Sequence, residues 1–160
     1  MSSDVVSWTY ELATVDDTYR FGAALGAVLG AGDLVLLDGP LGAGKTALTR
    51  GIARGMRVSG RVTSPTFVLA REHYASDWRR PALVHVDAYR LTSLAELDDL
   101  DLDTELTEAA VVVEWGGGFA ERLAEDNLLV RIERRADETR EITLYPQGRR
   151  WEERLPPDFE

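Results

Sequence analysis

The segment that decides the fold is Gly39-Pro40-Leu41-Gly42-Ala43-Gly44-Lys45-Thr46, which matches the phosphate-binding P-loop pattern G-x-x-x-x-G-K-[ST]. The mostly apolar residues 33–38 precede it and predict a strand, whereas residues 47–56 follow it and predict a helix. A strand, a glycine-rich loop and a helix in this order are the context in which the pattern binds phosphate. The sequence therefore predicts an α/β protein that binds a nucleotide through this loop.

The residue types of the loop each have a physical role in holding phosphate. Gly39, Gly42 and Gly44 lack a Cβ, so the backbone can curl and point successive N–H groups at an anion. The positive end of the following helix adds to this attraction. Lys45 supplies a point charge to the outer phosphates, and the Thr46 hydroxyl can bind a magnesium ion that bridges them. The loop residues expected to contact the nucleotide are Leu41, Gly42, Ala43, Gly44, Lys45, Thr46 and Ala47.

Two further apolar segments, residues 82–87 and 109–114, end in the acids Asp87 and Glu114. Runs this apolar are typical of strands buried on both faces of a parallel sheet. Ligands of such sheets bind beyond the carboxyl ends of the strands, so we expect both acids at the edge that carries the P-loop. An acid there can bind magnesium directly, hold it through water, or orient the attacking water, and the residues alone leave these roles open. A strand-end acid that only caps a turn is the alternative for each.

Segments on both sides of the P-loop predict the remaining elements. These are an edge strand at residues 5–12, a helix from Thr14 to about Leu29, a loop entering a strand at 62–69, a hairpin connection at 75–81, an acidic helix at 93–103, a short helix ending at Leu123, an antiparallel hairpin of residues 128–133 and 140–145, and a short helix after Gly148. Together they predict one P-loop NTPase domain over residues 1–160, with a core at about residues 8–150. The expected architecture is a three-layer α/β fold, in which helices flank a mainly parallel sheet and an antiparallel hairpin lies toward the C-terminus.

Composition and charge exclude several classes of protein. The 160 residues include no cysteine, which excludes disulfides, zinc–thiolate sites and thiol catalysis. No basic-then-apolar signal begins the chain and no apolar run approaches membrane-spanning length, so we expect a cytoplasmic protein with no membrane partner. The formal net charge of −10 makes direct binding of DNA or RNA unfavourable, because phosphate contacts require Lys and Arg. Any function on nucleic acid would therefore depend on a partner protein.

Four segments together resemble one protein family. They are the P-loop, Ser64-Pro65-Thr66-Phe67, His85-Val86-Asp87-Ala88-Tyr89-Arg90-Leu91 and Val113-Glu114-Trp115. Their order and spacing are similar to TsaE, also called YjeE, the bacterial P-loop ATPase family of tRNA threonylcarbamoyladenosine biosynthesis. The resemblance spans residues 8–150 or so, and the combination of His-x-Asp-x-Tyr-Arg with Glu-Trp makes it specific.

The resemblance implies a function and a role for each site residue. The protein would bind ATP or ADP and hydrolyse ATP, weakly on its own, in support of the TsaB–TsaD complex. That complex modifies an adenosine beside the tRNA anticodon, and tRNA would be contacted only through it. Lys45 would hold the phosphates as a catalytic residue, and Thr46 and Glu114 would bind Mg²⁺. Asp87 would be the catalytic acid near the attacking water, and Trp115 would lie beside the nucleotide.

The chain departs from the family pattern at two positions of the P-loop. Pro40 stands where the family generally has Asp, and Ala47 stands where a second Thr often follows Thr46. Pro40 has no N–H, so one donor of the phosphate cradle is absent. Neither change removes a group that phosphate or metal chemistry requires. The resemblance also places Ser64 and Thr66 in a switch-like loop.

Two other functions are compatible with the P-loop. A small-molecule kinase would use the same loop, but such enzymes usually close a basic lid over ATP, and no Arg-rich lid stands out after Glu114. A nucleotide-dependent binding module with negligible turnover would not need the acids Asp87 and Glu114. ATP turnover measured alone, with small acceptors and with TsaB–TsaD distinguishes the three functions.

Overall fold

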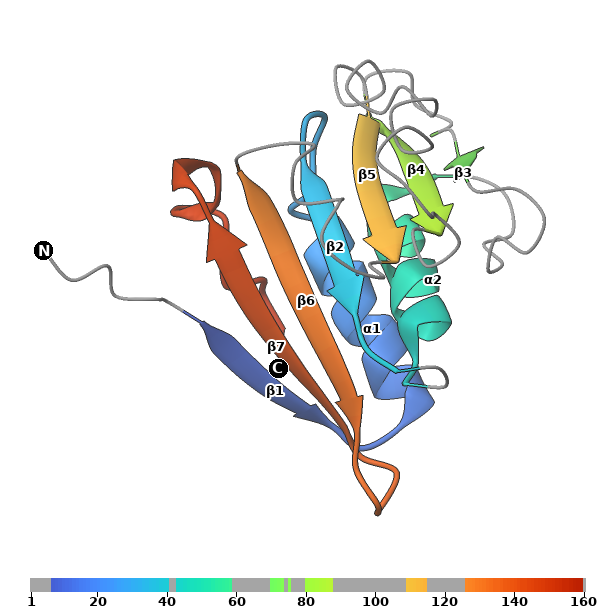
Figure 1. Cartoon of the computed structure of the whole chain (residues 1–160). Coiled ribbons are helices and arrows are strands. Elements are labelled where there is room, and N and C mark those ends of the chain that lie inside the picture. Colours follow the sequence, from blue (N-terminus) through green and yellow to red (C-terminus); the bar gives the residue numbers. More distant parts are fainter. Residues whose placement is uncertain are drawn as a thin grey trace, which may run out of the picture.

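The computed structural model describes residues 7–40, 43–58, 70–73, 75, 80–87, 109–114 and 126–159. In these residues, seven strands form one sheet, and two α-helices pack on one of its faces (Figure 1). The elements in chain order are β1 (Trp8–Leu12), α1 (Val15–Gly26), β2 (Leu34–Asp38), α2 (Lys45–Met56), β3 (Ala70–His73), β4 (Ala82–Asp87), β5 (Ala109–Glu114), β6 (Asn127–Arg134), β7 (Arg140–Gln147) and the 3-10 helix η3 (Arg149–Trp151). None of the described helices has the length and apolar character needed to cross a membrane.

The sheet is mixed, with strand order β1-β7-β6-β2-β5-β4-β3. The four strands β6, β2, β5 and β4 pair in parallel, whereas β3 at one edge and β7 and β1 at the other pair antiparallel. The predicted α/β fold, edge strand and C-terminal hairpin are confirmed. The prediction of a mainly parallel sheet holds for the four central strands only, because three of the six described strand pairs are antiparallel. Two of these pairs are joined by short connections, which only antiparallel strands permit.

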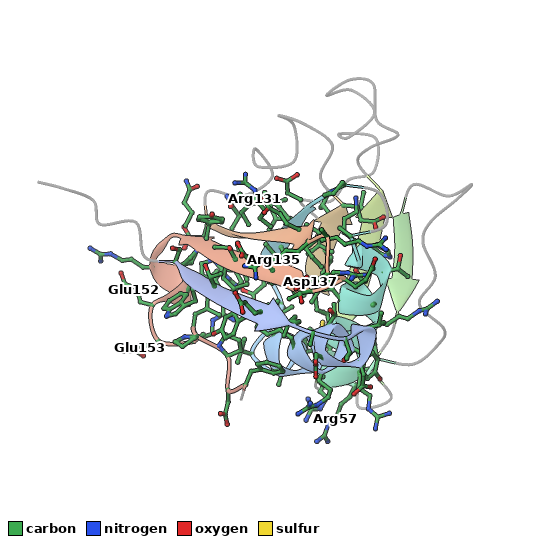
Figure 2. All side chains as sticks on the ribbon, turned by 90° about the horizontal axis from the view of Figure 1, so that it is seen from below. Arg57, Arg131, Arg135, Asp137, Glu152 and Glu153 are labelled. Atoms are coloured by element: carbon green, nitrogen blue, oxygen red, sulfur yellow. The ribbon has the colours of Figure 1, made fainter. Side chains whose placement is uncertain are left out.

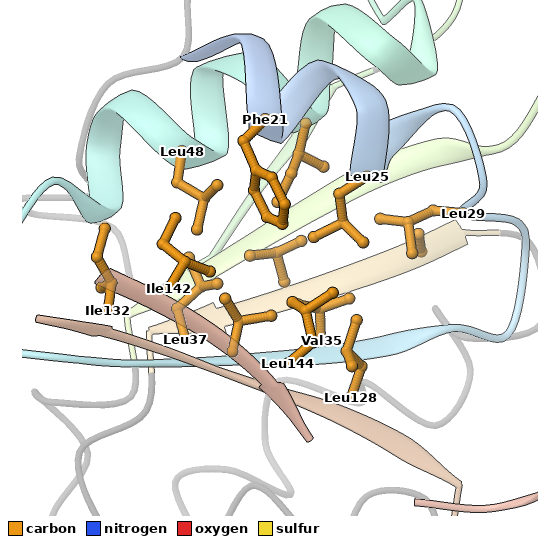
Figure 3. Close-up of a cluster of buried hydrophobic side chains, with 14 of the residues drawn as sticks. Phe21, Leu25, Leu29, Val35, Leu37, Leu48, Leu128, Ile132, Ile142 and Leu144 are labelled. Carbon is orange, nitrogen blue, oxygen red and sulfur yellow. The ribbon is translucent and has the colours of Figure 1, made fainter. Parts of the chain in front are cut away.

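The strands next to the P-loop are buried on both faces, as their apolar runs predicted. Val35 and Leu37 of β2 face the helices and belong to the main core, which Figure 3 shows between the helices and the sheet. Leu34 and Leu36 of the same strand point to the other face and are also buried. The predicted third layer depends on helices at 93–103 and before Leu123, and both lie outside the described residues.

Helix α1 begins as predicted and ends earlier than predicted. Thr14 and Asp17 form a capping box, in which the Asp17 N–H donates to the Thr14 hydroxyl at 3.0 Å and the Thr14 N–H donates to the Asp17 carboxylate at 3.2 Å. The α-helix ends at Gly26 rather than near Leu29. Its last turn tightens instead, because the Leu29 N–H donates to the Gly26 carbonyl at 3.2 Å, an i to i+3 bond.

The two helices pack closely against each other at glycine residues. A Cβ built on Gly22 or Gly26 of α1 would run into backbone carbonyl oxygens of α2, and one built on Gly51 or Gly55 would run into those of α1. Each of these glycines costs helix stability relative to alanine, so the sequence gives no local reason for them. The close contact of the two backbones is the reason, and it sets α2 at a fixed distance from α1.

The C-terminal segment (residues 149–159) closes over the turn between α1 and β2. Asp33 is fully buried there, and its carboxylate accepts hydrogen bonds from Arg150 Nε at 2.5 Å and from Arg154 Nη1 and Nη2 at 2.7 and 2.6 Å. Trp151 and Leu155 join the main core, which therefore continues past residue 150. The predicted short helix is the 3-10 helix η3.

The face of β6 and β7 away from the helices carries the charged Arg131 beside the aromatic Tyr145. Arg131 projects from the sheet on the side away from the helices, opposite Arg57 at the end of α2 (Figure 2). Its guanidinium pairs with Asp38 at 3.2 Å and lies over the ring of Tyr145 at 5.6 Å. In the turn between these strands, the N–H of Thr139 donates to the Asp137 carboxylate at 3.0 Å, which lowers the pKa of that carboxyl.

Candidate functional site

The P-loop connects the carboxyl end of β2 to the start of α2, as the sequence predicted. Lys45, Thr46 and Ala47 form the first turn of α2, and Gly44 precedes them with a left-handed φ of 109°. This conformation favours glycine, because other residues rarely adopt it. Of the predicted nucleotide-binding residues, Leu41, Gly42 and Trp115 lie outside the described residues.

Strand β6 lies directly behind the P-loop and fixes its path. A Cβ on Gly39 would lie 2.5 Å from the carbonyl oxygen of Ile132 and 2.7 Å from its Cγ2 atom, so only glycine fits this position. The Ala43 N–H donates to the Pro40 carbonyl at 3.1 Å, which closes a turn within the loop. The loop is therefore held by its own backbone and by the strand next to β2.

Lys45 lies inside the curl of the loop. Its Nζ donates to the Gly39 carbonyl at 2.8 Å, so the ammonium group is held at the entrance of the loop rather than in the core. The hydroxyl of Thr49 donates to the Lys45 carbonyl at 2.9 Å and reinforces the first turn of α2. The first N–H groups of a helix lack partners within the helix, so a loop of this shape aims them at an anion.

The two predicted acids end neighbouring strands. Asp87 is the last residue of β4 and Glu114 the last of β5, and they are opposite each other in the β4–β5 register. Glu114 is also level with Leu37, next to the end of β2 from which the P-loop begins. The expectation that both acids lie at the P-loop edge is confirmed, whereas their chemical roles stay predictions.

Glu114 has a neighbour that the sequence did not identify as part of the site. The residue is 7% exposed, and its Oε2 lies 3.6 Å from Nε2 of His85, which is fully buried on β4. Within the described part of the chain, neither ring nitrogen of His85 makes a hydrogen bond. The available signal was position, because His85 lies on β4 two residues before its last residue.

Arg140 is a second residue that the sequence did not place at the site. It begins β7, and its Nε donates to the Ala43 carbonyl in the P-loop at 3.0 Å. Its side chain is 11% exposed. Alternation along the strand was the available signal, since Ile142 and Leu144 are buried core residues and Arg140 continues their face.

The residues present fit a magnesium nucleotide. Phosphate fits the glycine-shaped loop and the Lys45 ammonium group, and the Thr46 hydroxyl and Glu114 carboxylate are the hard oxygen donors that Mg²⁺ prefers. Among the residues that the structure describes, no three His, Cys, Asp or Glu side chains gather as a metal site. Magnesium in nucleotide sites needs few protein ligands, because phosphate and water supply the others.

Comparison with known proteins decides the family. The family model described as "Threonylcarbamoyl adenosine biosynthesis protein TsaE" matches residues 12–142. The chain belongs to the TsaE family. The matched residues contain the P-loop and both strand-end acids, and they end before the C-terminal segment that covers Asp33.

Individual TsaE relatives cover most of this chain. The protein named "tRNA threonylcarbamoyladenosine biosynthesis protein TsaE" from Mycobacterium tuberculosis is 53% identical over 147 residues, with 88% of each chain covered. The protein of the same name from Streptomyces coelicolor is 55% identical over 137 residues, covering 82% of this chain and 92% of its own. The crystal structure of YdiB from Bacillus subtilis superimposes with a TM-score of 0.76 at 28% identity, covering 95% of this chain and 93% of YdiB.

Proposed function

We propose that this protein acts in tRNA threonylcarbamoyladenosine biosynthesis as its ATP-binding and ATP-hydrolysing subunit. The supporting observation is a P-loop between β2 and α2 in a chain of the TsaE family. In this proposal the protein does not transfer the threonylcarbamoyl group. It supports the TsaB–TsaD complex, which modifies the adenosine beside the anticodon of tRNA in the cytoplasm.

The proposal gives each site residue a distinct task. The backbone of residues 41–47 and the Lys45 ammonium group bind the phosphates of ATP or ADP. Thr46 and Glu114 hold Mg²⁺, which neutralises phosphate charge when bound. Asp87 orients the attacking water, and Trp115 lies beside the nucleotide.

The net charge supports an indirect contact with tRNA. With a formal net charge of −10, the chain has too few basic residues for a continuous phosphate-binding face. In addition, Arg131, Arg134 and Arg135 are each paired with acids. A partner protein must then supply the affinity for tRNA. We also propose that TsaB–TsaD completes the ATP site on docking. A weak ATPase would then become active only in the assembly.

A reconstitution experiment tests the proposal. ATP hydrolysis is measured for the full chain alone, with tRNA, with TsaB–TsaD, and with both, and Lys45→Ala serves as the control without phosphate binding. We expect turnover to rise with TsaB–TsaD, tRNA alone to have little effect, and Lys45→Ala to remain folded and inactive.

Three results would contradict the proposal. Unchanged nucleotide affinity in folded Lys45→Ala would remove the P-loop assignment. Submicromolar binding of tRNA by the isolated chain would remove the indirect contact. Turnover that depends on a small hydroxyl acceptor, and not on TsaB–TsaD, would favour a small-molecule kinase instead.

A further inference from the structure

Arg140 joins the P-loop to a strand that is distant in sequence. Its guanidinium donates from Nε to the Ala43 carbonyl at 3.0 Å and from Nη1 to the Glu138 carbonyl. A Cβ built on Gly44 would lie 3.6 Å from Arg140 Nε, so the side chain lies directly against the loop. With 11% of this side chain exposed, the bond to Ala43 is largely shielded from water.

The bond to Ala43 controls the direction of a neighbouring N–H group. The Ala43 carbonyl and the Gly44 N–H belong to one planar trans peptide, so they point in opposite directions. Holding the carbonyl oxygen toward β7 therefore turns the Gly44 N–H toward the other side of the loop. Gly44 has a φ of 109°, and without such an anchor a glycine peptide can rotate at low cost.

Arg140 is itself held rigidly. It pairs across the sheet with Leu12 of β1 and with Arg134 of β6, so strands flank it on both sides. The turn beside it is closed by the Arg135 N–H, which donates to the Thr139 carbonyl at 2.8 Å. A donor on a paired strand holds its target more precisely than one on a free loop.

We infer that Arg140 is a positioning residue for the P-loop, which holds the Ala43–Gly44 peptide so that the Gly44 N–H faces the bound phosphate. The inference rests on the proposed nucleotide binding and adds to it a residue from β7. It assigns Arg140 no contact with the nucleotide. Its effect should therefore appear in nucleotide affinity, because a loop that must reorganise before binding loses affinity.

The test compares Arg140 with its cross-strand neighbour. ADP affinity is measured by calorimetry for the wild type, Arg140→Ala, Arg140→Lys and Arg134→Ala. Arg134 has the same charge, lies opposite Arg140 and pairs with Glu138 at 2.5 Å. We expect Arg140→Ala to weaken ADP binding by about tenfold, because a loop freed from this charge-assisted bond must reorganise before it binds. Arg140→Lys should recover part of the loss, and Arg134→Ala should change affinity by less than about twofold.

A spectroscopic readout separates positioning from general stability. In ¹⁵N-labelled protein, the Gly44 amide resonance should move strongly on addition of ADP to the wild type and to Arg134→Ala, and weakly in Arg140→Ala. Melting temperatures identify variants that do not fold. If Arg140→Ala is one of them, Arg140→Lys is compared with the wild type and with Arg134→Ala instead.

The outcomes are distinguishable. Wild-type ADP affinity in a folded Arg140 variant overturns the inference and leaves the proposed function intact. An equal loss in Arg134→Ala also overturns it, because any charge in the hairpin would then suffice. A wild-type protein that binds no ADP overturns the proposed function, and the inference with it.

Discussion

Asp87 and Glu114 occupy equivalent positions at the ends of neighbouring strands, but we expect their loss to have different effects. Glu114→Ala should weaken ADP binding only in the presence of Mg²⁺, because its carboxylate is proposed to hold the metal. Asp87→Ala should leave ADP binding unchanged and slow hydrolysis by ~10²-fold or more, the scale of general-base effects. ADP titrations with and without Mg²⁺, and turnover with TsaB–TsaD, measure the two effects. If both variants hydrolyse ATP at the wild-type rate in that assembly, neither acid has the proposed role.

His85 is expected to contribute little to the stability of the protein. Its imidazole is fully buried, and within the described chain its nitrogens have no hydrogen-bond partner, so burying it costs free energy. His85→Leu should therefore leave the free energy of unfolding unchanged or raise it by about 1 kcal/mol. Leu83→Ala, at a fully buried position on the same face of β4, should lower it by about 2–5 kcal/mol. Urea denaturation compares the two, and a loss in His85→Leu as large as in Leu83→Ala would contradict the prediction.

At the scale of single elements, the glycine contact between α1 and α2 reverses the usual effect of alanine. In an isolated helix, Gly51→Ala would add about 1 kcal/mol of stability. Here the new Cβ would meet the Tyr19 carbonyl and lie 2.9 Å from Gly22 Cα, and such overpacking costs about 1–3 kcal/mol. We therefore expect a net loss of stability, measured by thermal or urea denaturation.

Gly30→Ala is the matched control for the helix contact. An added Cβ at Gly30 meets no atom within 4 Å, and its φ is not in the left-handed region. This change should be neutral or slightly stabilising, because alanine restricts the unfolded chain. A stabilising effect of Gly51→Ala similar to that of Gly30→Ala would show that the helices tolerate a larger separation.

Features determined by adjacent residues could be predicted from the sequence, and features determined by distant ones could not. The P-loop, the start of α1 at Thr14 and the β6–β7 hairpin each depend on a few neighbouring residues, and all were predicted. The glycines of α1 and α2 depend on packing between the two helices. The role of Arg140 depends on β7 lying beside β6, which in turn lies behind the P-loop. No spacing in the sequence connects Arg140 to Ala43, because 97 positions separate them.

At the scale of the whole molecule, removing the charge of the buried Asp33 is expected to destabilise the protein. Asp33→Asn keeps the shape of the side chain and removes the charge that faces Arg150 and Arg154. We expect the free energy of unfolding to fall by about 3 kcal/mol, since breaking a buried ion pair leaves charges uncompensated. ADP affinity of the folded protein should not change, because Asp33 precedes β2 at the end opposite the P-loop.

An exposed ion-pair cluster provides the control for Asp33. Glu11 pairs with Arg135 at 2.8 Å on the surface, where water screens the attraction. Glu11→Gln should therefore change the urea midpoint far less than Asp33→Asn. If Asp33→Asn changed the urea midpoint as little as Glu11→Gln, the C-terminal segment would be held by its apolar residues Trp151 and Leu155 rather than by the ion pairs.

The pairing of β1 with β7 determines when the molecule can be completed during its synthesis. Trp8 lies opposite Leu144, so β1 has no place in the sheet until β7 has been synthesised and has left the ribosome. Closing so long a loop costs entropy before any contact compensates for it. A ribosome that stops before β7 would release a chain in which β1 has no partner strand among those described and the edge of β6 that β7 covers is open. Such edges pair readily with those of other chains, so premature termination here should yield aggregates rather than a smaller folded protein.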